Sequence, residues 1–374
     1  MKRGILMSNK KVSISESSMV SPIFVFFLIH AMQVGVGILG FEKHIVQKVG
    51  YDGWISLIIS GLLVHIILWM IYSILNNNSH NDIVTVHRKM FGRYIGHFVS
   101  MLFSLYFLLL TLEVMRTYIE VVQVWIFPQL NIWFFTLVFI LLIYYLVSGG
   151  IRTITGIAVI SVMIGIPLIL LKIFPVQTGD IVATYPSVKH NVSDLLLGVE
   201  PSLLSFLGVE LLFVYYPFLK HARSSQKWAQ FGAFFTLLVY LISMIISFMY
   251  FSEEQIKIVT WPTLDLWKIV DFPFLERFEY IGIAVWLFVV LPNCCLALWG
   301  ATRIPKRIFH IKQKYVLAAF CLVLYLSTCL LNELIEVNHL NDITNRIGVY
   351  VLMYIPILWV LKLIFYKVRN NYER

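Results

Sequence analysis

Apolar runs of about 20 residues recur along the whole chain, and this repetition constrains the fold more than any other feature of the sequence. A run of that length matches the hydrocarbon core of a bilayer. A helix can cross that core because it makes its backbone hydrogen bonds internally. No stretch between the runs is long enough to form a separate soluble domain. The sequence therefore predicts an all-α, polytopic membrane protein with about ten transmembrane helices.

The apolar runs give the boundaries of the expected spans. We place them at 19–48, 53–75, 98–124, 132–148, 154–174, 200–219, 229–251, 279–302, 315–331 and 347–366. They form one permease-like transmembrane domain over residues 19–366, with tails at 1–18 and 367–374. The run that starts at Met19 continues through His30 and Gln33 without a small-residue cleavage site, so we expect a retained first helix and not a signal peptide.

Charge sets the expected orientation and excludes soluble and nucleic-acid-binding classes. Only 13% of the residues are charged, against about 25% in soluble domains. If the N-terminus is cytoplasmic, 20 Lys and Arg residues fall on the inner side and eight on the outer side, which agrees with the positive-inside rule. Both tails are therefore predicted to be cytoplasmic. The net charge of +9 comes from loops without a basic stripe or stacking aromatics, so the lipid bilayer is the expected partner and nucleic acid is not.

The sequence shows no enzyme or metal motif. It has no HExxH, no P-loop, no GxSxG with partners, and no GxGxxG after a strand. The four cysteines lie in apolar runs without metal-ligand spacing, so we expect neither a metal site nor a disulfide framework. We therefore predict no catalytic residues and no cofactor.

The first span carries a cluster of glycines at its middle. Gly35, Gly37 and Gly40 fall within six residues, and each costs about 1 kcal/mol relative to alanine inside a helix. Two interpretations stay open. The glycines either allow close helix packing, or they mark an unwound segment that faces a cavity.

The sixth span has a similar irregularity. Leu207 and Gly208 precede Glu210, a carboxylate near the middle of an apolar run. The first and sixth spans correspond if ten helices form two inverted five-helix repeats, and interrupted helices at matching positions indicate a transporter-type binding site. Glu210 would either brace the opened backbone or contact the cationic end of a ligand. The predicted ligand-binding residues are Gly35, Val36, Gly37, Leu207, Gly208 and Glu210.

The third span carries three ionisable residues. Glu113, Arg116 and Glu120 are spaced three and four apart, which places them on one helical face. Charges at membrane depth are costly, so they should face the protein interior. We predict an internal charge cluster, with ligand or ion contact as the alternative.

Two connecting stretches suggest more than linkers. Residues 82–97 alternate apolar and basic side chains, which is typical of an amphipathic helix on the inner surface or of a solvated basic loop. Residues 252–279 form a long outer loop around Trp261-Pro262-Thr263, and loops of this length are often functional.

Several segments together resemble the spore germination permease family, the B-type subunits of nutrient germinant receptors. That family belongs to the amino acid–polyamine–organocation superfamily. The most specific elements are Trp261-Pro262-Thr263 and Leu275-Glu276-Arg277 with Glu279. One departure is that the family often has a proline after the first-helix glycines, where this chain has Gly40-Phe41-Glu42. The full set of matching segments is 14–15, 35–39, 50–55, 116–120, 207–212, 260–264 and 274–279.

The resemblance implies a broken-helix fold in the inner membrane of a bacterial spore. It implies a receptor complex with an A-type membrane subunit and a C-type lipoprotein, in which this subunit binds a small nutrient, expected to be an amino acid. The alternatives are a working amino-acid or ion transporter of the same fold, and a scaffold subunit of the complex. The sequence does not separate a sensor from a transporter, because both need the same cavity.

Overall fold

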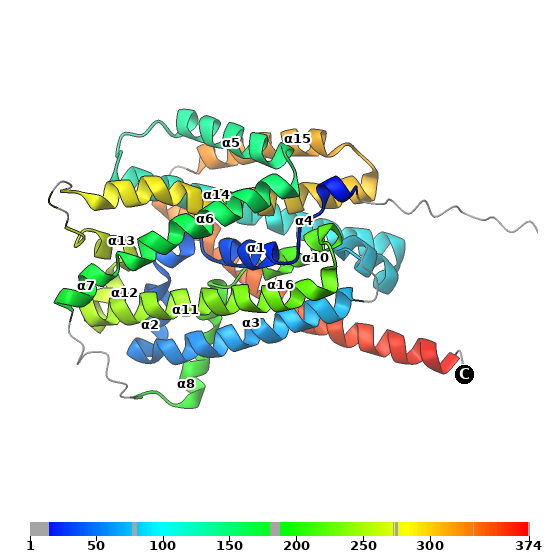
Figure 1. Cartoon of the computed structure of the whole chain (residues 1–374), viewed down its shortest axis with the longest axis horizontal. Helices are drawn as coiled ribbons and strands as arrows, with labels where there is room; N and C mark the ends of the chain where they lie inside the picture. The colour runs from blue at the N-terminus through cyan, green and yellow to red at the C-terminus, as the bar shows by residue number, and fades with distance from the viewer. Residues whose placement is uncertain are drawn as a thin grey trace, which may run out of the picture.

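The computed structural model describes residues 15–76, 81–179, 188–271, 273, 276–331 and 333–372. Most of the predicted N-terminal tail, Phe274 and Leu275 of one family motif, and the last two residues lie outside these ranges. The described chain is a bundle of helices (Figure 1). Its one isolated pairing of extended backbone within those ranges joins Val20 to Leu219 in parallel.

Seven helical segments are long and apolar enough to cross a membrane. An eighth is a pair of helices bent by 51° at a short break, and two further apolar helices are shorter. In the described part of the chain these make the ten apolar segments predicted from the sequence. Eight of the segments each correspond to one helix: α3 (Gly53–Leu75), α4 (Ile83–Trp125, kinked at Gly92), α5 (Ile132–Ser148), α6 (Ile151–Leu170), α11 (Gln226–Tyr250), α14 (Phe278–Phe309), α15 (Gln313–Leu330) and α16 (Leu334–Tyr372).

The first and sixth segments are the interrupted ones. The first consists of α1 (Phe24–Gln33), the short 3-10 helix η2 (Val36–Leu39) and α2 (Phe41–Val49). The elements of the sixth are α8 (Val192–Leu197), α9 (Val199–Leu204), η5 (Val209–Leu211), α10 (Leu212–Tyr215) and η6 (Tyr216–Phe218). Breaks at these two positions are the arrangement expected of two inverted five-helix repeats, and the predicted fold class is confirmed.

Helix α1 lies at the centre of the bundle, where it packs against α6, α11 and α14. Small residues permit the close approach of the helices around it. A Cβ at Gly232 of α11 would lie 2.7 Å from the carbonyl oxygen of Phe26, and one at Gly61 of α3 would lie 2.7 Å from Leu237. Such glycines are typical of helix contacts in membranes, where packing and not the hydrophobic effect holds helices together.

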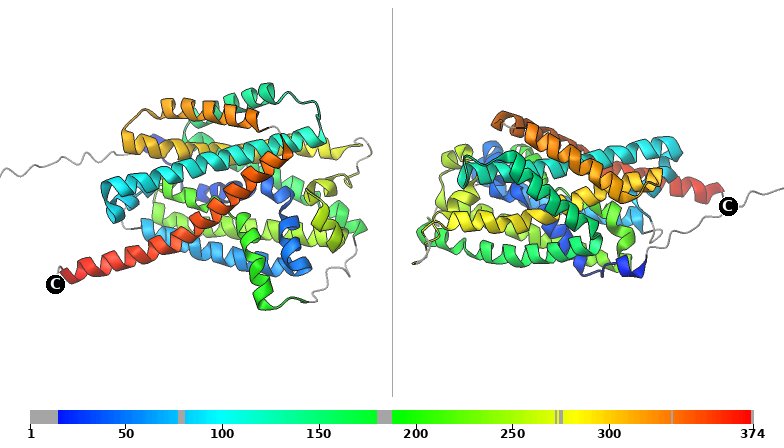
Figure 2. Two further views of the ribbon diagram at one scale, coloured as in Figure 1. Left: turned by 180° about the vertical axis from the view of Figure 1, so that it is seen from behind. Right: turned by 90° about the horizontal axis from the view of Figure 1, so that it is seen from above.

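The periphery of the bundle is apolar. Helices α5 and α15 lie side by side at one edge (Figure 1). Large side chains on their surfaces, such as Phe134, Leu141 and Leu322, are mostly exposed. Helix α16 runs obliquely across the bundle and projects beyond it at its C-terminal end (Figure 2). An apolar surface of this kind suits a lipid environment.

Helices also occur in three regions that the predicted spans leave out. Helix α4 begins at Ile83, so the basic stretch that follows Asp82 is helical, with a sharp kink at Gly92 (φ 79°). The stretch 82–97 is therefore helical and not a loop, and its position on the inner surface stays a prediction. Helix α16 begins at Leu334, well before the predicted position 347. The long 252–279 stretch contains two short helices, α12 (Glu253–Ile258) and α13 (Pro262–Trp267).

Candidate functional site

The backbone of the first segment leaves the helical conformation at Val34 and Gly35. In a continuous helix the carbonyls of Ala31 and Met32 would accept from the amides four residues on, and the break removes both partners. The side-chain nitrogen of Asn293 on α14 replaces them, donating to each carbonyl oxygen at 2.8 Å. A Cβ at Gly35 would lie 2.9 Å from the Asn293 oxygen, so only glycine lets the amide approach this closely.

Two further side chains bond carbonyls at the same break. The hydroxyl of Tyr240 donates to the carbonyl of Gln33 at 2.9 Å, and the indole of Trp286 donates to the carbonyl of Gly35 at 3.3 Å. Buried backbone groups that lack a partner are expensive, and more so at membrane depth. The open conformation is therefore stabilised by donors from α11 and α14.

The second break centres on Gly208, which has the left-handed conformation (φ 104°). Its N–H donates to both carboxylate oxygens of Glu210, at 3.0 and 3.1 Å, and the hydroxyl of Tyr106 on α4 donates to the same carboxylate at 2.8 Å. The two breaks also contact each other. The Gln33 side-chain nitrogen donates to the carbonyl of Phe206 at 3.3 Å, and a Cβ at Gly208 would lie 2.2 Å from Met32.

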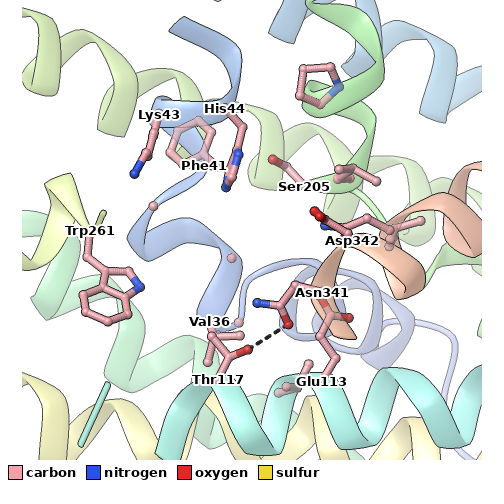
Figure 3. Close-up of a pocket in the computed structure, with 18 of the residues that line it drawn as sticks. Val36, Phe41, Lys43, His44, Glu113, Thr117, Ser205, Trp261, Asn341 and Asp342 are labelled. Carbon is pink, nitrogen blue, oxygen red and sulfur yellow. Dashed lines mark hydrogen bonds between the residues drawn. The ribbon is translucent and has the colours of Figure 1, made fainter. Parts of the chain in front are cut away.

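A cavity of about 540 Å³ lies beside the two breaks. This volume is within the range typical of small-molecule sites. Figure 3 shows part of its lining, with Val36 and Phe41 of the first segment facing Glu113 and Thr117 of α4. Helices α2, α9, α14 and α16 and the residues just before α13 complete the wall. The cavity therefore brings together parts of the chain that are far apart in the sequence.

The structure places the six predicted ligand-binding residues in two groups. Gly35, Val36, Gly37 and Leu207 line the cavity. Gly208 and Glu210 are buried behind the lining, where their mutual hydrogen bonds shape the second break. Ligand contact by the four lining residues stays a prediction. For Glu210, the hydrogen bonds to Gly208 favour the role of bracing the opened backbone.

The three ionisable residues of α4 do not form a closed cluster. Glu113 and Glu120 line the cavity, but Arg116 points elsewhere and donates from Nε to the carbonyl of Leu331 at 2.7 Å. Within the described ranges no ion pair joins Arg116 to either glutamate, although Glu120 is near enough to interact through its charge. The expected ion pairs among the three residues are therefore not seen. Arg116 instead bonds a backbone carbonyl, and the two carboxylates lie in the cavity wall.

Several polar residues of the cavity have no counterpart in the sequence-based set. Asn293 and Gln33 are almost fully buried, and their nitrogens are fixed by backbone carbonyls, so their oxygens are left without a hydrogen-bond partner in the described structure. The spacing of polar residues after 334 is the one signal that could have revealed the α16 wall, because it repeats every three to four residues. That wall consists of Asn338, Asn341, Asp342 and Asn345.

The lining can bind a small polar ligand with charges of both signs. Unpartnered amide oxygens and the carboxylate of Glu113, which has no bonded or charged partner in the described chain, suit an ammonium group. Lys43 and His44 of α2 line the same cavity and suit a carboxylate or another anionic group. Thr117 donates to the Asn341 oxygen at 3.2 Å, which fixes that amide of α16 beside α4 in the cavity wall (Figure 3).

Comparison with known proteins assigns the chain to a family. The family model described as spore germination protein, spore permease, matches residues 19–337. The chain belongs to the spore germination permease family. One relative is spore germination protein GerQB of Bacillus cereus, 40% identical over 94% of this chain and 98% of that protein. Another is spore germination protein YndE of Bacillus subtilis (strain 168), 24% identical over 87% of this chain and 91% of that protein.

Solved structures with the same fold extend beyond germination proteins. MhsT in complex with L-phenylalanine has a TM-score of 0.61 at 15% identity, covering 91% of this chain and 87% of that one. Mhp1, a nucleobase-cation-symport-1 family transporter with bromovinylhydantoin bound, has a TM-score of 0.62 at 12% identity, covering 87% and 75%. This germination permease is thus an integral membrane protein with a transporter-like fold, as the sequence predicted.

Proposed function

We propose that this germination permease is the B-type, nutrient-binding subunit of a spore germinant receptor. A small nutrient, an amino acid in the first instance, binds in the cavity beside the two helix breaks. Binding is then passed to an A-type membrane subunit and a C-type lipoprotein in the inner spore membrane, with both tails of this chain in the cytoplasm. Membership of the family and likeness to GerQB support the receptor role.

The observation that carries the ligand proposal is the pair of unpartnered oxygens on Gln33 and Asn293. Buried acceptors of this kind usually have a partner, and a ligand ammonium would supply one. Their nitrogens already donate to backbone carbonyls, so neither amide can turn to satisfy its own oxygen. A scaffold subunit would not need a polar cavity with unpaired acceptors.

Direct binding tests this proposal. The full-length chain in lipid nanodiscs is titrated with each of the twenty amino acids by calorimetry, and Glu113→Gln is compared with Glu254→Gln. Glu254 is mostly exposed and pairs with Lys257 on α12, away from the cavity. We expect one or a few amino acids to bind, with affinity about tenfold weaker in Glu113→Gln and unchanged in Glu254→Gln. Absence of binding by every amino acid would contradict the amino-acid assignment.

A second candidate function is transport, because the fold is shared with the transporter Mhp1. Radiolabelled uptake into vesicles separates the two roles. A receptor subunit gives a nutrient response in spores that carry its partners but no accumulation in vesicles. A carrier gives accumulation that depends on the same cavity residues.

A further inference from the structure

The segment 253–267, which holds α12 and α13, lies against the second half of the interrupted first helix. The side-chain nitrogen of Gln47 on α2 donates to the carbonyl of Lys257 at 3.0 Å, and that of Lys43 donates to the carbonyl of Ile258 at 3.3 Å. The proposed function gives this segment no role, although it contains the Trp261-Pro262-Thr263 motif.

The segment approaches the first break very closely at Gly40. A Cβ there would lie 2.5 Å from the carbonyl oxygen of Thr260 and 3.3 Å from the ring of Trp261. Only glycine tolerates this contact, because the Thr260 atom belongs to the backbone and cannot turn away. Trp261 itself lines the cavity, where it forms one side of the wall (Figure 3).

A network of buried polar groups holds α13 in this place. Thr263 donates to Oε1 of Glu42 at 3.2 Å and accepts from Nζ of Lys172 at 3.1 Å. Ser247 also donates to Oε1 of Glu42 at 3.1 Å, and Lys172 donates to Ser243 at 2.7 Å. All five side chains are buried to at least 97%. The network therefore joins α2, α11 and α13 to Lys172, which follows α6.

The hydroxyl of Thr263 makes two hydrogen bonds of opposite direction, which few side chains can do. It must donate to the carboxylate and accept from the ammonium, and a hydroxyl does both. Glu42 and Lys172 lie too far apart to form an ion pair within 4.0 Å in the described structure, so Thr263 bridges them. Buried charges are strongly destabilising without hydrogen-bonding partners, and Thr263 is a partner of each.

A second contact links α13 to the first break, at Gly35. Trp267 at the end of α13 packs against Gly282 and meets Trp286 with ring centroids 5.5 Å apart. Trp286 in turn donates to the carbonyl of Gly35. Displacement of α13 would therefore disturb the cavity wall at Trp261 and the open backbone at Gly35 together.

We propose that Thr263 is a positioning residue. Its hydroxyl bridges Glu42 and Lys172 and so fixes α13 with Trp261 against the cavity and Trp267 behind the first break. This role goes beyond nutrient binding and does not depend on which nutrient binds. It predicts that loss of the hydroxyl loosens α13 specifically.

Hydrogen–deuterium exchange of the full-length chain in lipid nanodiscs tests the proposal without any ligand. The amides of Leu264 and Asp265 donate to the carbonyl of Trp261, so peptides covering 259–270 report on α13. Thr263→Val keeps the shape and removes the hydroxyl, whereas Thr263→Ser retains it. Thr328→Val is the matched control, because Thr328 is buried and its hydroxyl has no hydrogen-bond partner in the described structure.

We expect exchange in 259–270 to be about tenfold faster in Thr263→Val and within about twofold of the wild type in Thr263→Ser and Thr328→Val. Peptides from α5 should not change in any variant, because α5 lies at the far edge of the bundle. Unchanged exchange in folded Thr263→Val, or equally fast exchange in Thr263→Ser, would overturn the proposal. If Thr263→Val yields no folded protein, the neutral pair Glu42→Gln with Lys172→Met is measured. Normal exchange in that pair overturns the proposal as well.

A response assay adds a measurement that a purely structural role would not move. Spores carrying the variant chain are exposed to an equimolar mixture of the twenty amino acids. We expect Thr263→Val to raise the half-maximal concentration about tenfold with the maximal response retained, and Thr263→Ser to restore it. If wild-type spores do not respond, the amino-acid assignment fails, and the exchange result still decides the role of Thr263. A fall in maximal response alone, with unchanged half-maximal concentration, would contradict the proposal.

Discussion

The carboxylate of Glu210 accepts the backbone N–H of Gly208 through both of its oxygens, at 3.0 and 3.1 Å. Donor and acceptor are two positions apart in the sequence, so the side chain folds back and accepts the N–H group of the left-handed glycine. The carboxylate thereby becomes part of the second break and is buried behind the cavity wall.

Replacement of Glu210 by glutamine should change the response only modestly. The amide keeps one oxygen for the Gly208 N–H and the Tyr106 hydroxyl but loses the charge, which weakens these bonds by about 1 kcal/mol. We expect near-normal abundance in membrane fractions. The half-maximal nutrient concentration should rise by about threefold to tenfold over that of the wild type. Tyr106→Phe, which removes the other donor, should have a similar effect. A complete loss of response in Glu210→Gln at normal abundance would instead indicate direct ligand contact.

Gly35 and Gly37 form a matched pair for testing the first break. A Cβ at Gly35 would clash with the Asn293 amide at 2.9 Å, whereas one at Gly37 would meet only the Tyr240 hydroxyl at 4.0 Å. We expect Gly35→Ala to lower abundance or abolish the response, with a cost of about 1–3 kcal/mol from overpacking. Gly37→Ala should leave abundance unchanged. Immunoblots of membrane fractions and nutrient dose–response curves measure both, and equal tolerance of the two alanines would contradict the packing at Gly35.

Asn293 should matter for stability as well as for binding. Asn293→Ala leaves the carbonyls of Ala31 and Met32 without their side-chain donor, at a cost of about 1–3 kcal/mol for each unsatisfied group. We expect a lower melting temperature of the nanodisc-embedded chain. Asn345→Ala is the control, because Asn345 lines the cavity from α16 without bonding that backbone. A similar melting temperature for both variants would show that the carbonyls find other partners.

Arg116 should act on stability through Leu331 and not through Glu113. Arg116→Met removes the donor to the Leu331 carbonyl, and we expect reduced abundance from a loss of about 1–3 kcal/mol. Because the structure shows no pairing with Glu113, adding Glu113→Gln should not restore the protein. Recovery of abundance in the double variant would revive the mutual charge cluster expected from the helical spacing.

The bundle itself follows from hydropathy and glycine placement. The apolar runs mark the ten segments, and the glycines at 35–40 and 208 mark both interruptions, because an interior glycine weakens a helix wherever it stands. The same pattern could not fix the start of α16. A search for apolar runs finds only helical segments rich in apolar residues. The first turns of α16 carry polar residues that face the cavity, so the apolar run begins after the helix does.

The cavity was only partly predictable. Backbone irregularity located Gly35, Val36, Gly37 and Leu207, but nothing in an isolated sequence shows which distant side chain completes a broken helix. Asn293 lies among cysteines and leucines of α14, and its partners are about 260 residues earlier in the chain. Helical spacing put Arg116 on one face with two glutamates, but its side chain turns away from the cavity to the carbonyl of Leu331. Spacing within one helix does not reveal a carbonyl supplied by another part of the chain.

The parallel bridge between Val20 and Leu219 bears on the choice between sensing and carrying. Val20 donates to the carbonyl of Phe218 and accepts from the amide of Lys220, each at 2.8 Å. The beginning of the first segment is therefore hydrogen-bonded to the end of the sixth. Arg152 adds two further bonds to the carbonyls of Glu16 and Met19. A carrier that releases its substrate past this end of the bundle would have to break these hydrogen bonds in every transport cycle. A receptor that only signals ligand occupancy could keep them intact, and the membrane of a dormant spore would then stay impermeable at this point.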